Sequence, residues 1–79
     1  MSYIDAIIGK DMNNTDLYSI FVKDYGTYYV PKKDINYLLL QYLDNDEFWK
    51  MNMMNGYDIE FKVDDFFVDL LKIRAIKIE

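Results

Sequence analysis

The chain has 79 residues with 14 acidic and 9 basic side chains, a net charge of −5, which is room for one small acidic domain spanning residues 1–79. Its hydrophobic content of 52% excludes a disordered chain, and its aromatic content of 18% is well above ordinary usage. Cysteine and histidine are both missing, which excludes disulfides, zinc-thiolate sites and the usual general base.

These absences leave little chemistry for an active site. The serines and threonines have no histidine to activate them, and the three glycines are isolated rather than gathered in a phosphate-binding loop. We therefore expect no enzyme activity, no catalytic residue, no cofactor and no metal ligand. No signal peptide and no membrane-length apolar run is visible, so we expect a cytoplasmic protein, in a bacterial host cell, without membrane contact.

The first predicted element is a short helix over residues 2–9. Ser2 is a favourable N-cap residue, while Ile4, Ile7 and Ile8 follow helical spacing and Gly9 provides a stop. This helix would pack its isoleucines on the core.

The next predicted elements are a β-hairpin and a helix. A three-residue loop over residues 24–26 pairs Val22 with Tyr28 and Ile20 with Val30, with Gly26 in the left-handed position. Proline then ends the second strand. Helical spacing predicts a helix over residues 33–43, whose N-terminal end Asp34 would cap or complement.

A second hairpin is predicted over residues 49–63. Residues 57–63 alternate apolar and charged side chains, and residues 49–53 alternate upstream of them. A three-residue loop over residues 54–56 matches the apolar faces and places Lys50 opposite Glu60. An amphipathic helix then begins at Asp64 and Asp65, and a final strand is predicted over residues 73–78.

The predicted fold is therefore α+β, with the order α-ββα-ββαβ. It has an antiparallel sheet of four or five strands, with two or three helices on one face. Gly26 and Gly56 lie 30 positions apart, and each precedes an aspartate by eight residues. This spacing suggests two degenerate ββα units, at about 17–43 and 47–72, with coincidence as the alternative.

Charge is concentrated in residues 44–69, which contain eight acidic side chains against two basic ones, a net charge of −6. Such a surface repels nucleic acids and anionic lipids and attracts basic proteins. A solubilising surface is the alternative interpretation. A calcium loop starting at Asp44 is excluded, because its sixth and twelfth positions hold Trp49 and Asn55 instead of glycine and glutamate.

Eight tyrosines, five phenylalanines and one tryptophan are more aromatic side chains than a domain of this size can bury. Exposed aromatic residues are favoured anchors of protein–protein contacts, and the acidic surround disfavours stacking on single-stranded nucleic acid. The predicted partner-binding residues, combining charges with two aromatic anchors, are Asp44, Asp46, Glu47, Trp49, Tyr57, Asp58, Glu60, Asp64, Asp65 and Asp69.

In small size, acidity, aromatic excess and lack of catalytic groups, the chain resembles small phage-encoded inhibitors of the anti-CRISPR and DNA-mimic types. The resemblance is one of overall character. It implies a stoichiometric inhibitor that binds a basic nucleic-acid-handling protein, in particular a CRISPR effector, without touching nucleic acid itself. The alternative is a small cofactor-free interaction domain, or a structural or regulatory subunit, with a homodimer through apolar patches left open.

Overall fold

The computed structural model describes residues 3–53 and 58–79, which form five strands and three helices. The strands are β1 (Ile4–Lys10), β2 (Leu17–Val22), β3 (Gly26–Pro31), β4 (Ile59–Val63) and β5 (Lys77–Ile78). The helices are α1 (Lys32–Leu39), α2 (Asn45–Met53) and α3 (Asp65–Arg74). The predicted α+β class is confirmed.

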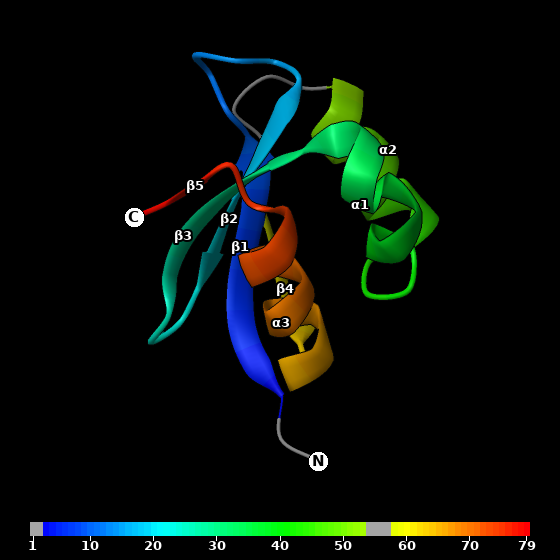
Figure 1. The fold of residues 1–79 in the computed structure, drawn as a ribbon. Helices are drawn as coiled ribbons and strands as arrows, with labels where there is room; N and C mark the ends of the chain where they lie inside the picture. Colours follow the sequence, from blue (N-terminus) through cyan, green and yellow to red (C-terminus); the bar gives the residue numbers. More distant parts are fainter. Residues whose placement is uncertain (1–2, 54–57) are drawn as a thin grey trace.

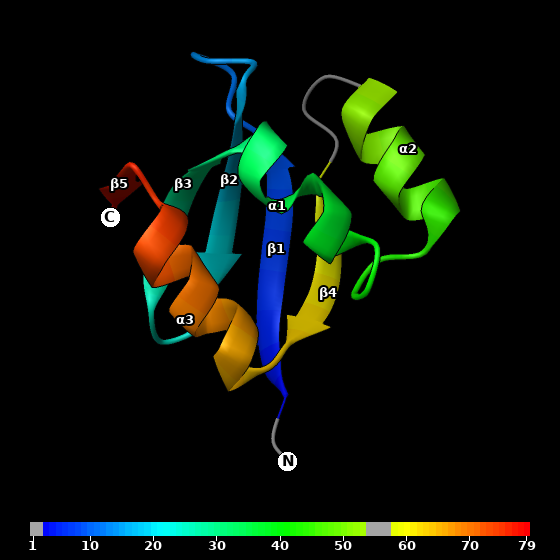
Figure 2. The ribbon, with the colours of Figure 1, turned by 45° about the vertical axis from the view of Figure 1, so that its right-hand side comes forward.

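The strands form one sheet in the order β4-β1-β2-β3-β5, and every neighbouring pair is antiparallel. All three helices lie on the same side of this sheet, and its other face has no helix over it (Figures 1 and 2). We call that uncovered side the open face. The predicted arrangement of an antiparallel sheet with helices on one side is confirmed.

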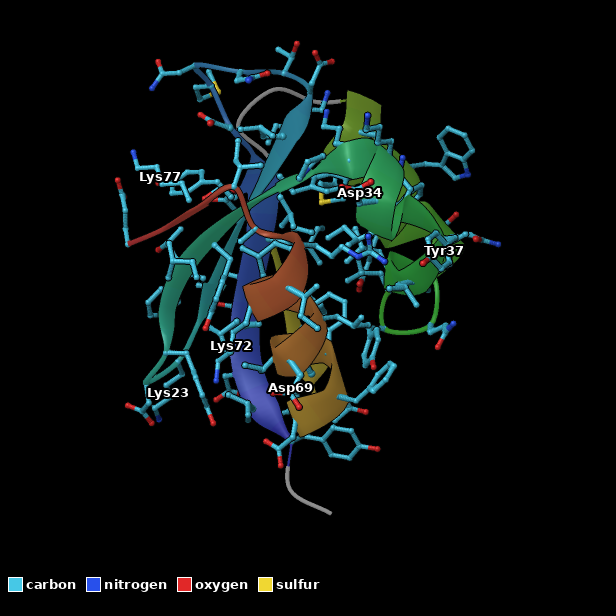
Figure 3. All side chains as sticks on the ribbon, viewed as in Figure 1. Lys23, Asp34, Tyr37, Asp69, Lys72 and Lys77 are labelled. Atoms are coloured by element: carbon cyan, nitrogen blue, oxygen red, sulfur yellow. The ribbon has the colours of Figure 1, made fainter. Side chains whose placement is uncertain are left out.

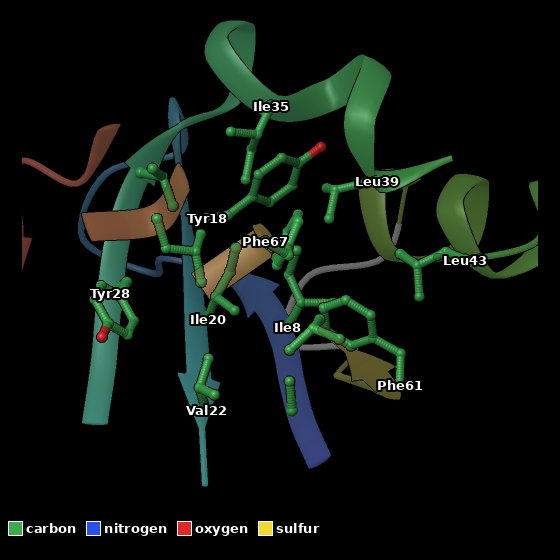
Figure 4. Close-up of a cluster of buried hydrophobic side chains, with 14 of the residues drawn as sticks. Ile8, Tyr18, Ile20, Val22, Tyr28, Ile35, Leu39, Leu43, Phe61 and Phe67 are labelled. Carbon is green, nitrogen blue, oxygen red and sulfur yellow. The ribbon is translucent and has the colours of Figure 1, made fainter. Parts of the chain in front are cut away.

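The core lies between the sheet and the helices (Figure 4). Alternate strand residues point into it, as the period of two requires, and β4 follows this pattern residue by residue. Phe67 of α3 packs edge-on against Phe61, with ring centroids 6.2 Å apart, and lies 4.8 Å from the Tyr42 ring. The fully buried side chains are Ile8, Tyr18, Ile20, Val22, Val30, Ile35, Leu39, Met51, Val63, Phe67, Val68 and Leu71.

A buried tyrosine joins the sheet to two helices. The Tyr18 hydroxyl donates to Asn52 Oδ1 at 3.1 Å and also contacts the side-chain amide of Asn36. The Asn52 amide nitrogen donates to the carbonyl oxygen of Phe48 at 2.9 Å, which fixes the orientation of that amide. One residue of β2 therefore holds both α1 and α2 over the sheet.

The predicted N-terminal helix over residues 2–9 is wrong, because residues 4–10 form strand β1. Ala6 and Ile8 point into the core, whereas Asp5 and Ile7 lie on the open face. Ile7 is apolar although it lies on the open face. Together with Ile4 and the buried Ile8 it produces the spacing of apolar residues that is typical of a helix. The expected N-cap, Ser2, lies outside the described residues.

The predicted strand over residues 49–53 is also wrong, because these residues belong to α2. Phe48 and Met51, three positions apart, are its buried residues, which is helical rather than strand spacing. The partner of β4 is β1, with Ile4 opposite Val63, so β4 does not pair with the segment just before it. The predicted loop over residues 54–56, including Gly56, lies outside the described residues.

The first hairpin has the predicted loop length but begins one residue earlier. Val22 pairs with Gly26 and Ile20 with Tyr28, so the loop is residues 23–25 and the register differs from the prediction by two. A shift of two preserves the side-chain faces, and the inward-facing residues are those predicted. Asp24 adopts the left-handed conformation, with φ at 69°, and Gly26 has φ at 113°.

The C-terminal elements differ from the prediction mainly in their boundary. Asp64 lies at the start of α3 as expected and caps it, but this helix continues to Arg74, so the final strand shrinks to β5. Pro31 occupies the N-cap position of α1, and Asp34 lies in the first turn without making a side-chain cap. The segment 47–72 contains helix, strand and helix in place of the predicted ββα unit, because α2 replaces its first strand.

Candidate partner-binding surface

The eight acidic residues of the segment 44–69 lie on or next to α2, the edge strand β4 and the first half of α3. α3 then crosses the sheet, because Lys72 in its last turn lies 5.2 Å from the Tyr25 ring in the β2–β3 turn. We call the described residues of this segment, 44–53 and 58–69, the acidic end; β4 is the edge strand, and α3 extends from its end across the sheet.

Three of the predicted residues lie at the start of α2. Asp44 caps the helix, because its Oδ1 accepts the backbone N–H of Glu47 at 2.8 Å. Asp46 and Glu47 occupy the first turn, where carboxylates are favoured by the helix dipole. Asp44 and Asp46 are exposed, so their charges face solvent although both residues also stabilise the start of the helix.

Asp58 and Glu60 are exposed at β4, on the side of the strand away from the core. Together with Glu47 and Lys50 of α2 they line one shallow hollow, which also contains Ile7 and Ile59. Two of the predicted acidic segments thus meet across this hollow. Lys50 and Glu60, predicted as cross-strand neighbours, share the hollow although Lys50 belongs to a helix.

Asp64 has a more structural position than its neighbours. Its Oδ1 accepts the backbone N–H of Phe67 at 2.9 Å and the hydroxyl of Tyr42 at 3.0 Å. Burial, and then this bond to a carboxylate, raises the pKa of Tyr42 to about 12. Asp65 and Asp69, one turn apart on α3, are exposed and carry no such constraint (Figure 3 labels Asp69).

Trp49 and Phe66 are exposed aromatic residues of the acidic end, with 60% and 62% of their surfaces accessible, and Trp49 is the predicted anchor. It follows Phe48, whose ring is buried and lies nearly perpendicular to the indole, with centroids 6.0 Å apart. Helical geometry explains the contrast, because successive residues of a helix point in different directions. The other predicted anchor, Tyr57, lies outside the described residues.

Basic residues collect at the opposite edge of the molecule. Lys77 of β5 lies 5.2 Å from the Tyr29 ring and pairs with Glu79 at 2.7 Å, and Arg74 ends α3. Figure 3 shows Lys23 and Lys77 on the side of the sheet away from Tyr37 of α1. Each edge nevertheless has charges of both signs, because Lys50 and Lys62 lie among the acidic residues near β4 and Glu79 pairs with Lys77 near β5.

One group of surface residues, those of β1 on the open face, was not predicted from the sequence. Ile7 pairs with Phe21, and both are exposed, at 37% and 44%. Asp5 pairs with Lys62 at 2.7 Å, and this hydrogen bond and charge lower the pKa of Asp5, with Lys23 as a weaker contributor. The alternation of inward Ala6 and Ile8 with these outward residues is the sequence pattern from which β1 and its open face could have been predicted.

Within residues 3–53 and 58–79, no three acidic side chains come together in a way that could bind a metal ion. No helix in the same residues has the length and apolar character needed to cross a membrane. No protein-family model, curated protein or solved structure matches the chain. The function is therefore argued from the surface itself.

Proposed function

We propose that this protein is a stoichiometric inhibitor that binds a basic nucleic-acid-handling protein, in particular a CRISPR effector, in the cytoplasm of a bacterial host. The observation that supports this proposal is the concentration of eight acidic residues on α2, β4 and α3 or next to them, in a chain of net charge −5. A surface of this kind favours encounter with a positively charged groove and disfavours encounter with nucleic acid.

The mechanism is occupancy of phosphate-binding positions. Exposed carboxylates on α2, β4 and α3 would meet lysine and arginine side chains that otherwise contact the nucleic-acid backbone. Asp58, Glu60, Asp65 and Asp69 are the strongest candidates, because their side chains are exposed and, within residues 3–53 and 58–79, cap no helix. Asp44 and Asp64 would contribute charge while also holding their helices.

Trp49 would provide the apolar part of the contact. Its indole projects from the acidic helix α2 with 60% of its surface accessible, and tryptophan is strongly enriched among residues that dominate binding energy. Charge would govern the rate of association, whereas burial of the indole would slow dissociation.

The experiment measures target-DNA binding by purified CRISPR effector–guide complexes as this protein is added in increasing molar ratio. We expect one effector class to lose DNA binding at stoichiometric inhibitor, and the affinity for the inhibitor to fall with added salt. Asp58→Asn combined with Glu60→Gln should weaken that affinity by slowing association.

The matched control is Asp16→Asn combined with Asp24→Asn. Both residues are exposed, Asp16 just before β2 and Asp24 in the turn after it, outside the acidic end, and both double variants remove two negative charges. An equal loss of affinity in the two double variants would show that net charge, not the acidic end, drives binding. Salt-independent binding abolished by Trp49→Ala would favour the alternative, an uncharged interaction module.

A further inference from the structure

The open face of the sheet presents three successive cross-strand pairs on its central strands β1 and β2. Ile7 pairs with Phe21, and Gly9 pairs with Ser19 one step along. In the other direction Asp5 and Lys23 are neighbours, because the Lys23 backbone N–H donates to the Asp5 carbonyl oxygen at 3.0 Å. Along β1 and β2 the open face therefore presents, in order, a charged pair, an apolar pair and a pair of small residues.

The apolar and charged pairs surround a hollow of about 490 Å³, whose rim also contains Glu60 and Lys62 of β4. This rim has two acidic and two basic side chains, unlike the acidic end. A uniformly basic or acidic partner would find half of the rim repulsive. A partner carrying both signs in the same arrangement would match it, and a second copy of the chain has that arrangement.

We propose that the open face is the contact surface of a homodimer, formed by two sheets stacked about a two-fold axis that runs along the strands between β1 and β2. This symmetry lays β1 of one copy over β2 of the other. Ile7 then contacts Phe21 of the second copy, and Asp5 lies over Lys23 of the second copy. At the Gly9–Ser19 level β1 and β2 have only small side chains, and the bulky residue beside them is Tyr29 of β3, the register partner of Ser19.

The size of the open face indicates a weak dimer. Five strands about 4.8 Å apart, with about six residues rising about 3.3 Å each, give a face of roughly 20 by 20 Å. Its projected area of about 400 Å² is below the about 800 Å² per partner that stable complexes bury. Association should therefore depend on concentration, with a Kd between about 10 μM and about 1 mM.

This contact leaves α2 and α3 outside the interface, because they lie on the other side of the sheet (Figure 1), whereas Glu60 of β4 lines both surfaces. The dimer would then present two copies of α2 and α3 to its surroundings. The self-association and the proposed inhibition are separable by experiment, since self-association is measured without a partner protein and inhibition is measured with one.

The test is sedimentation equilibrium of the full chain at concentrations from about 10 μM to about 1 mM, the range set by the expected affinity. The average mass should rise from the monomer value of 9.5 kDa toward twice that value. Ile7→Lys should raise the Kd at least about tenfold, because it buries an ammonium group in the contact. Within one chain the new lysine would face Glu60, its partner in β4, so the fold should tolerate it.

Two further variants test the surface and its symmetry. Tyr37→Lys makes the same change at an exposed aromatic residue of α1, on the helical side, and should leave self-association unchanged. Lys23→Glu should weaken the dimer, and combining it with Asp5→Lys should restore part of the loss, because the two charges face each other across the axis.

Circular dichroism and thermal unfolding of each variant separate a lost contact from a lost fold. A mass of 9.5 kDa at every concentration would overturn the proposal. An equal effect of Ile7→Lys and Tyr37→Lys would place self-association elsewhere, and a double charge variant as weak as Lys23→Glu would overturn the proposed two-fold arrangement.

Discussion

Replacing Tyr18 by phenylalanine isolates the contribution of a single buried hydroxyl group. The ring is fully buried on β2, and its hydroxyl contacts Asn36 of α1 and Asn52 of α2. Phenylalanine fills the same space, so the packing of the ring should persist. The variant would lose only the polar connection between the sheet and the two helices.

The expected loss follows from the number of groups left without a partner. Each hydrogen bond contributes about 0.5–1.5 kcal/mol, and a buried polar group left unpaired costs about 1–3 kcal/mol. Both asparagines are half-buried, so water can reach part of their amides and the full penalty does not apply twice. We expect the free energy of unfolding to fall by about 2 kcal/mol, which lowers Tm by about 8–16 °C for a domain of this size.

The control is Tyr29→Phe, which removes a hydroxyl that donates to Glu79 Oε2 at 3.1 Å on the exposed surface. Water can replace that bond, so this variant should lose less than about 0.5 kcal/mol. Urea unfolding of both variants measures the difference directly. Equal midpoints for Tyr18→Phe and Tyr29→Phe would refute the view that the buried hydroxyl joins the three elements.

Three further predictions concern backbone, pH and capping. Gly26→Ala should destabilise the protein by about 1–3 kcal/mol in urea unfolding, because φ is +113° and the new Cβ would lie 2.3 Å from the Glu79 carbonyl oxygen; an unchanged midpoint would contradict this. The pKa of Tyr42 is raised from 10.0 to about 12, so its contribution to stability is complete below pH 10 and lost as the pH rises toward 12. Tyr42→Phe should flatten this part of the stability–pH curve, and an unchanged slope would contradict the assignment. Asp44→Ala should cost about 1 kcal/mol as a lost N-cap, more than Asp46→Ala in the same turn, and equal losses would argue against the cap.

Side-chain faces could be predicted from the sequence more reliably than strand partners. The alternation over residues 59–63 identifies the buried side of β4 whichever strand lies beside it. Its actual partner is β1, so that Ile4 pairs with a residue 59 positions away in the chain. A local pattern has no information on such a distant pairing, and the nearest alternating segment was chosen as the partner instead.

That segment became α2 because its helical signals act together. Asp44 caps the helix, acidic residues occupy its first turn, and Phe48 and Met51 share its buried side. Trp49, which is exposed, lies two positions before Met51, so the two residues gave the appearance of the apolar alternation of a strand. An apolar residue on the surface therefore misdirected the prediction, as Ile7 did in β1.

The acidic end could be predicted as a set of charges, because charge is a property of the sequence, but its position is a consequence of topology. Pairing of β4 with β1 makes β4 an edge strand, and edge strands need protection against pairing with other chains. Asp58 and Glu60 on β4 can provide that protection by charge repulsion alone. Asp65 and Asp69 lie on α3, where they protect no strand edge. Asp65 lies in the first turn of α3, where the helix dipole favours a carboxylate, so it needs no partner to explain it. Asp69 has neither role, and it is therefore the residue at which the proposal of a basic partner and the defence of the sheet lead to different expectations.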